Sequence, residues 1–171
     1  MSIRIFFQRS VCLWLVFCLA QGAFAQNPTD DDLPPDPGAI SITRAQDLLF
    51  GAFSKTGSGG TVTVLNNGSR MATGGIVLLN LGQVYYPAIF EIEAPPGTII
   101  SILNGPDATL TGSNGGALTL TLGSCSPASP FTTTVASPGT TSVSIGGTLT
   151  VGASNPPGTY SGSFSVIVNY Q

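Results

Sequence analysis

Histidine is absent from this chain of 171 residues, and charged residues make up only 8% of it. Without an imidazole there is no histidine-ligated metal and no Ser–His or Cys–His couple of the kind that most nucleophilic enzymes use. An ordinary soluble domain has about 25% charged residues. Here five basic and eight acidic residues give a net charge of −3. The sequence therefore offers no basic surface for a polyanion, and we expect no nucleic acid partner.

The first 25 residues have the three zones of a secretory signal peptide. Two arginines form a basic start, and the apolar run Val11–Ala20 is too short to cross a bilayer as a helix. Small residues precede the expected cleavage site between Ala25 and Gln26. We predict a protein secreted to the periplasm, the cell surface or the medium, which meets the membrane only through the signal before cleavage. A retained membrane anchor is the competing interpretation.

Cysteine is scarce, and two of the three cysteines lie within the predicted signal. The exported chain would keep only Cys125 and could not form an internal disulfide, so burial and sheet hydrogen bonds must stabilise it. The composition of Gly123–Pro127 predicts that Cys125 lies in a loop as an unreactive thiol. An intermolecular disulfide is the alternative. A catalytic thiolate is disfavoured because no basic residue lies nearby in the sequence to lower its pKa.

Residues 26–38 read as a linker that contains four aspartates, four prolines and a single large apolar residue, Leu33. Such a segment buries too little surface to offset the entropy of ordering it. Asp30–Asp32 is interpreted as a solvated acidic tether, because no loop converges its carboxylates on a calcium ion. Residues 39–171 then form one domain.

That domain shows no helical periodicity, and its abundant Gly, Thr, Ser and Val favour short strands joined by turns. Asn66-Asn67-Gly68 predicts a hairpin with a type I′ turn, because Asn-Gly tolerates a positive φ. We predict an all-β fold, an immunoglobulin-like antiparallel β-sandwich. The expected strands are Ala39–Arg44, Leu48–Phe53, Gly60–Leu65, Arg70–Leu79, Ala88–Glu93, Thr98–Leu103, Ala117–Leu122, Phe131–Ala136, Thr141–Val151 and Thr159–Tyr170.

Two features could suggest sugar chemistry. Glu91 and Glu93 would share one face of a strand, about 6–7 Å apart, which is close to the spacing of a glycosidase pair. We interpret them as a solvated stripe opposite core residues. Tyr85 and Tyr86 would point to opposite faces, so one of them could stack on a sugar ring. We therefore assign no catalytic residue, no cofactor and no metal ligand.

The last third of the chain is unusual in charge and in pattern. Ala108–Gln171 contains no charged side chain, so its strands lack the charges that usually prevent edge pairing. Within it, Thr159–Tyr170 alternates cleanly. Tyr160, Gly162, Phe164, Val166, Val168 and Tyr170 fall on one face, and Ser161, Ser163, Ser165 and Asn169 fall on the other, with Ile167 as the exception.

Several motifs carry a resemblance to a known family. Tyr170 is penultimate and Gly158 is fourteenth from the end, a pattern found in subunits of chaperone–usher pili. Asp47–Phe53, Ala72–Gly75 and Gly146–Gly152 complete the likeness. Residues 39–171 thereby resemble a secreted bacterial family of domains of unknown function (DUF4402-like), related to spore coat protein U and to those pilins. The resemblance implies a pilin-like sandwich.

It also implies a role. In such pilins a periplasmic chaperone captures the C-terminal strand by β-augmentation, and a neighbouring subunit's extension later replaces the chaperone. Carried over, the assembly residues are Gly158, Tyr160, Gly162, Phe164, Val166, Val168 and Tyr170. This chain departs from pilins because it lacks an early disulfide and because residues 26–38 cannot act as a donor. The sandwich is then either complete in one chain, or Ala39–Thr43 doubles as the donor.

These observations predict an exported, non-enzymatic surface or fimbria-like structural protein. Its C-terminal strand would pair with a chaperone, an usher or like subunits during assembly. The alternative is a secreted carbohydrate-binding or adhesin module that acts as a monomer.

Overall fold

The computed structural model describes residues 40–171. The predicted signal peptide, the cleavage site Ala25/Gln26, the linker 26–38 and Ala39 lie outside the described residues. The described part is all-β, with thirteen strands and no helix, which agrees with the predicted fold class at that level. Nothing within it could serve as a helical membrane span.

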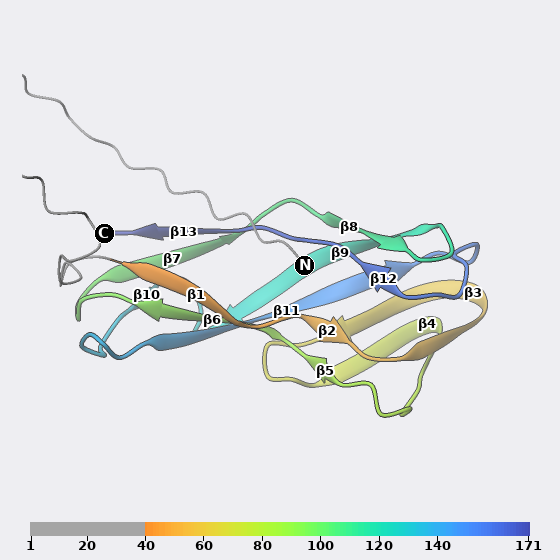
Figure 1. Cartoon of the computed structure of the whole chain (residues 1–171), viewed down its shortest axis with the longest axis horizontal. Coiled ribbons are helices and arrows are strands. Elements are labelled where there is room, and N and C mark those ends of the chain that lie inside the picture. The colour runs from red at the N-terminus through yellow and green to blue at the C-terminus, as the bar shows by residue number, and fades with distance from the viewer. Residues whose placement is uncertain (1–39) are drawn as a thin grey trace, which may run out of the picture.

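The strands are β1 (Ser41–Gln46), β2 (Leu49–Phe50), β3 (Phe53–Val64), β4 (Arg70–Leu78), β5 (Tyr85–Tyr86), β6 (Ala88–Glu93), β7 (Ile99–Asn104), β8 (Ala108–Gly112), β9 (Ala117–Ser126), β10 (Phe131–Thr132), β11 (Thr141–Val151), β12 (Tyr160–Ser161) and β13 (Val166–Tyr170). They form an eight-stranded sheet, a three-stranded sheet and a two-stranded ribbon (Figure 1). Every pairing between these strands is antiparallel.

The eight-stranded sheet is organised around β11. Its order is β1-β6-β11-β9-β8-β12, and β3 and β4 join it at β11. One edge of β11 pairs with β6 over Thr141–Ile145 and then with β3 over Gly147–Val151, while β9 takes the other edge. The change of partner occurs at Gly146, which is buried. A Cβ there would overlap the carbonyl oxygen of Val64, so only glycine permits so close an approach of β3 to β11.

The three-stranded sheet has the order β10-β7-β13, and β2 pairs with β5 in the ribbon. Side chains from both larger sheets meet in one hydrophobic core, which includes Phe90 and Ile92 of β6, Ile145 of β11, Ile100 of β7 and Val166 of β13. Strand β6 shows how the sequence produces this core. Its residues alternate between buried and half-buried, as expected for a strand with one face against the core.

Most of the predicted strands are present. Thr141–Val151 and Ala88–Glu93 have the predicted bounds, and β4 ends one residue before the predicted Leu79. Two segments have similar sequences, Gly115–Leu120 and Gly146–Val151. They are neighbours in the sheet, because Leu120 of β9 lies opposite Leu149 of β11.

Several local predictions are wrong. The expected strand Leu48–Phe53 shortens to β2, β3 begins at Phe53 instead of Gly60, and β5 and β8 were not predicted. The hairpin after β3 is present, but Gly68 is its only residue with positive φ (83°), whereas a type I′ turn needs two. The Gly68 N–H donates to the Leu65 carbonyl, which fits a type I turn followed by a left-handed glycine. Cys125 lies in β9 rather than in a loop, and the predicted strand Phe131–Ala136 shortens to β10. Thr159–Tyr170 is two strands, not one.

Candidate functional site

The C-terminal segment passes from one sheet to the other. Tyr160 and Ser161 pair with β8 in the eight-stranded sheet, whereas Val166–Tyr170 pair with β7 in the three-stranded sheet. The crossing begins at Gly162, where a Cβ would stand 2.5 Å from the Thr109 carbonyl oxygen. The seven predicted assembly residues therefore do not form one continuous strand. Gly158 lies in a bend before β12, and the other six are divided between β12, the crossing and β13.

The burial of the predicted face is graded along the segment. Phe164 and Val166 are buried, with only 4% and 5% of their surface exposed. Val168 is half-buried and Tyr170 is exposed. Tyr160 is half-buried, and its hydroxyl donates to the Pro156 carbonyl at 2.6 Å. The apolar face thus begins in the core and emerges at its surface toward the end of β13.

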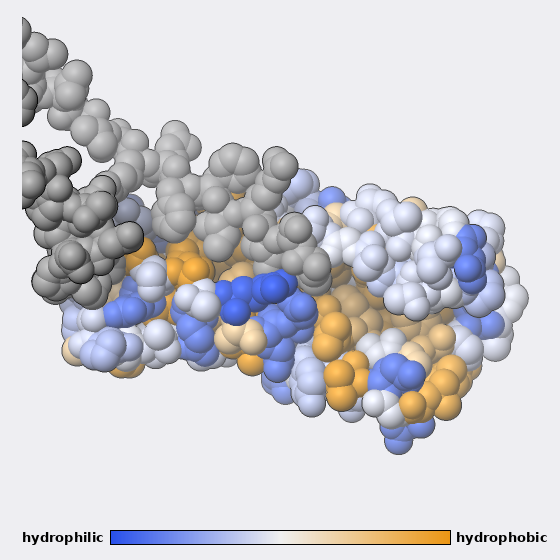
Figure 2. Space-filling view, in the orientation of Figure 1, coloured by the Kyte–Doolittle hydropathy of each residue, from blue (hydrophilic) through white to orange (hydrophobic). Residues whose placement is uncertain are grey.

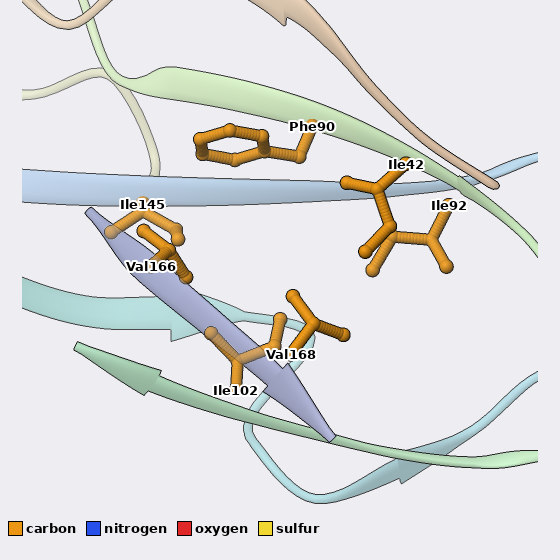
Figure 3. Close-up of a pocket in the computed structure, with 7 residues that line it drawn as sticks. All are labelled: Ile42, Phe90, Ile92, Ile102, Ile145, Val166 and Val168. Carbon is orange, nitrogen blue, oxygen red and sulfur yellow. The ribbon is translucent and has the colours of Figure 1, made fainter. Parts of the chain in front are cut away.

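An apolar groove lies where that face emerges (Figure 3). It lies between β1, which contributes Ile42, and β13, which contributes Val166 and Val168. In Figure 3, Ile42 lies beside Ile92, and Val166 lies beside Ile145. The lining side chains are all hydrocarbon: Ile42, Phe90, Ile92, Ile102, Ile145, Val166 and Val168. The pattern in Thr159–Tyr170 predicted two of these seven. The other five come from strands whose proximity only the sheet order reveals.

Among the described residues, 40–171, each side of the groove is an edge strand. Strand β13 ends the order of the three-stranded sheet, and β1 ends the order of the eight-stranded sheet. Ser41, Ile42 and Thr43 are already paired with β6 of the same chain. Most of the alternative donor Ala39–Thr43 in the sequence-based prediction, namely Ser41–Thr43, thus contributes to this chain's own sheet.

The backbone of β13 presents regular hydrogen-bonding groups at the open edge. The N–H of Gln171 donates to the Ile99 carbonyl at 3.1 Å, and the N–H of Ile99 donates back at 3.0 Å. In an antiparallel ladder such pairs recur at every second residue, so Ile167 and Asn169 also bond toward β7. The N–H and C=O groups of Val166, Val168 and Tyr170 then point toward the open edge.

The residues considered for sugar chemistry lie elsewhere. Glu91 accepts a hydrogen bond from the Thr140 hydroxyl at 2.7 Å, and Glu93 accepts one from the Ser137 hydroxyl at 2.5 Å. Both carboxylates lie on the half-buried outer positions of β6, away from the groove. They are half-buried and hydrogen-bonded to hydroxyl groups, on the face of β6 opposite its buried residues.

Tyr85 and Tyr86 form β5, and both are exposed. Figure 2 shows apolar surface around the β2–β5 ribbon, to which the exposed residues Leu49 and Val84 contribute. Beneath the ribbon, the Arg70 guanidinium lies 5.2 Å from the centre of the Tyr85 ring, and its Nη2 donates to the Ala52 carbonyl at 2.6 Å. Burial lowers the pKa of Arg70, and the attraction of Tyr85 opposes this effect.

Cys125 is half-buried and packs against the core, opposite Ile145. It is a free thiol.

The family comparison covers the domain described above. The sequence model of a family described as a domain of unknown function (DUF4402) matches residues 40–170. No curated protein and no solved structure matches the chain. The matched region includes every strand of the described structure and both sides of the groove. The chain therefore belongs to the DUF4402 family.

Proposed function

We propose that this chain is an exported, non-enzymatic surface or fimbria-like structural protein whose strand β13 pairs with a strand of another polypeptide during assembly. Two antiparallel sheets around one core support an immunoglobulin-like, pilin-like sandwich, of the kind expected for relatives of spore coat protein U and of chaperone–usher pilins. A periplasmic chaperone, an usher or like subunits are the partners implied.

The observation that carries the proposal is the character of the β13 edge. Proteins usually protect their edge strands with charges, proline, bulges or very short length. The other strands that end a sheet order are protected in this way. Strand β1 contains Arg44 and a register shift, β10 and β12 have two residues each, and β4 contains Arg70 and a left-handed glycine, Gly74. Strand β13 has five residues with no charge, proline or glycine.

The groove indicates what would occupy this edge. A strand hydrogen-bonded to β13 would lie over β1, because Ile42 and Val168 line the same groove. The edge strand of an intact second copy would bring along its own second sheet, stacked about 10 Å away, into space that β1 already fills. A free extended segment of another polypeptide avoids that clash. Its apolar residues would meet the groove at every second position.

This chain's own residues 26–38 are poor candidates for that role. They contain four aspartates and four prolines. Proline cannot donate to a ladder, and aspartate would bring charge into a groove lined by hydrocarbon. The incoming strand is therefore an uncharged segment of another polypeptide.

The second candidate is a monomeric carbohydrate-binding or adhesin module. The exposed Tyr85 and Tyr86 favour it, because aromatic faces with an apolar body and a polar tip suit binding surfaces. In that case β13 would have no intermolecular role, and loss of both rings would abolish sugar binding by the purified protein.

Site-directed labelling distinguishes the two. Val168 is half-buried and lines the groove, whereas Thr119 is exposed on β9, which lies inside its sheet. In a Cys125→Ser background, Val168→Cys should react with a bulky maleimide in the purified monomer but be protected in assembled surface material, because an incoming strand would cover the groove. Thr119→Cys should react equally in both. Labelling is located by mass spectrometry of the peptide. Equal reactivity of Val168→Cys in both samples would contradict assembly through β13.

A further inference from the structure

Ile167 breaks the alternation of β13, and the structure gives it a neighbour. Its side chain points away from the core and is 40% exposed. Its direct cross-strand partner is Leu103 of β7, which is 50% exposed. The next cross-strand pair on the same face is polar, with Asn169 opposite Ser101. Ile167 and Leu103 therefore form an isolated apolar pair, called here the outer pair, on the outer face of the three-stranded sheet.

The outer pair has no apolar neighbour on one side. Single exposed apolar side chains are common and need no explanation. Here, however, two of them stand directly opposite each other, and the strand that carries Ile167 is the outermost of its sheet. A third strand along β13 would place a residue beside Ile167, on the same face.

The alternation of hydrogen bonds along β13 defines the type of pair that this added residue would form with Ile167. Gln171 and Ile99 exchange both of their hydrogen bonds, so Ile167, four residues earlier, bonds toward β7 and not toward the open edge. An incoming antiparallel strand would meet Ile167 in a non-hydrogen-bonded pair. Side chains approach more closely in such a pair than in a hydrogen-bonded one, with Cα atoms about 4.5 Å apart. Of the outward positions on β13, Ile167 is the apolar one.

We infer that the strand which pairs with β13 carries a β-branched or aromatic residue on its outer face, directly opposite Ile167. This inference rests on the proposed function and adds to it. The partner segment is uncharged, has apolar residues at every second position toward the groove, and breaks that alternation once. The break would mirror the one that Ile167 makes in β13, and it would select one register among several.

A panel of synthetic peptides tests the inference. The parent peptide has nine uncharged residues, with valine at the positions that face the groove and threonine at the outer positions. Each variant replaces one outer threonine by isoleucine. Binding to the exported protein is measured by isothermal titration calorimetry. We expect one variant to bind about two- to fivefold more tightly than the parent, since a cross-strand pair of this kind is worth up to about 1 kcal/mol.

Two protein variants show whether the tighter peptide binding depends on Ile167. Ile167→Thr should abolish the gain in affinity. Ile99→Thr should preserve it, because Ile99 is 46% exposed on the same outer face but lies on the inner strand β7. If the peptides bind but no isoleucine peptide binds more tightly than the parent peptide, the inference is overturned while strand pairing stands. The same holds if the gain in affinity survives Ile167→Thr. If no peptide of the panel binds, pairing at β13 fails and the inference fails with it.

Discussion

Val166→Asp is the perturbation that the packing of β13 predicts most sharply. Val166 is 5% exposed and lies beside Ile145 on the groove wall (Figure 3). No side-chain hydrogen-bond donor lines this groove, because every lining side chain is hydrocarbon. The substitution therefore removes buried apolar surface and places a carboxylate where nothing solvates it.

The magnitude follows from these two losses. Burial of a valine contributes about 1.5–3 kcal/mol, and an uncompensated buried charge typically costs about 3–5 kcal/mol. A whole domain is stable by only about 5–15 kcal/mol. We expect the variant to lose at least about 3–5 kcal/mol of unfolding free energy, which corresponds to a fall in Tm on the order of 10–20 °C for a domain of this size.

The loss should also depend on pH. Burial raises the pKa of a carboxyl group above its value of about 3.9 in the unfolded chain. The carboxyl group is then ionised more easily in the unfolded state than in the folded state, so the charge lowers the stability most at pH values above the raised pKa of the folded state. This loss of stability becomes smaller as the pH falls. Below the pKa of the unfolded chain, only the loss of packing remains. The difference in stability between Val166→Asp and the parent protein should therefore narrow between neutral pH and about pH 4.

The adjacent position supplies the control. Ile167→Asp introduces the same carboxylate one residue away, on the exposed side of the same strand, and should cost less than about 0.5–1 kcal/mol. Urea unfolding followed by circular dichroism measures all three proteins. Equal losses for the two variants, or a Val166→Asp protein that unfolds like the parent, would refute the assignment of the buried face of β13.

Other predictions follow from neighbouring features. Gly162→Val should cost about 1–3 kcal/mol in urea unfolding, because a Cβ there stands 2.5 Å from the Thr109 carbonyl; Gly57→Val, whose Cβ would meet open space, should cost much less, and equal costs would contradict the crossing geometry. Arg70→Ala should lower stability by about 2–4 kcal/mol through loss of a charged hydrogen bond to Ala52 and of the Tyr85 contact. Arg44→Ala, which breaks an exposed pair with Asp47, should cost under about 1 kcal/mol in the same assay. Intact-mass analysis of the exported protein should give a chain that begins at Gln26, whereas full-length chains recovered from the membrane fraction would argue against the signal peptide.

The sequence predicts best the strands whose residues alternate over their full length, so that one face packs against the core. Thr141–Val151 alternates in this way at the centre of its sheet, and its bounds agree with the prediction. The break at Gly162 could not be found in this way, because Tyr160 and Val166 keep the same period while their strands belong to different sheets. Periodicity reports which face a residue occupies and not which sheet it joins.

The residues that line the groove could be predicted from the sequence only in part, for the same reason. Val166 and Val168 stand out in the sequence because their segment is long and uncharged. Ile42 and Ile145 lie in strands far away in the sequence, and only the sheet order brings them to the same groove. Cys125 was assigned to a loop from its neighbours Gly123 and Pro127, whereas pairing with β11 extends β9 as far as Ser126. Cross-strand pairing overrode local composition at that site.

Residue-resolved amide hydrogen exchange tests the central claim most directly. In the isolated protein, the amides of Ile167 and Asn169 bond toward β7 and should exchange slowly, while those of Val168 and Tyr170 point to the open edge and should exchange fast. If β13 pairs with another polypeptide, the amides of Val168 and Tyr170 should become protected in assembled material, and the other two should change little. Unchanged fast exchange at Val168 and Tyr170 after assembly would contradict strand pairing at this edge.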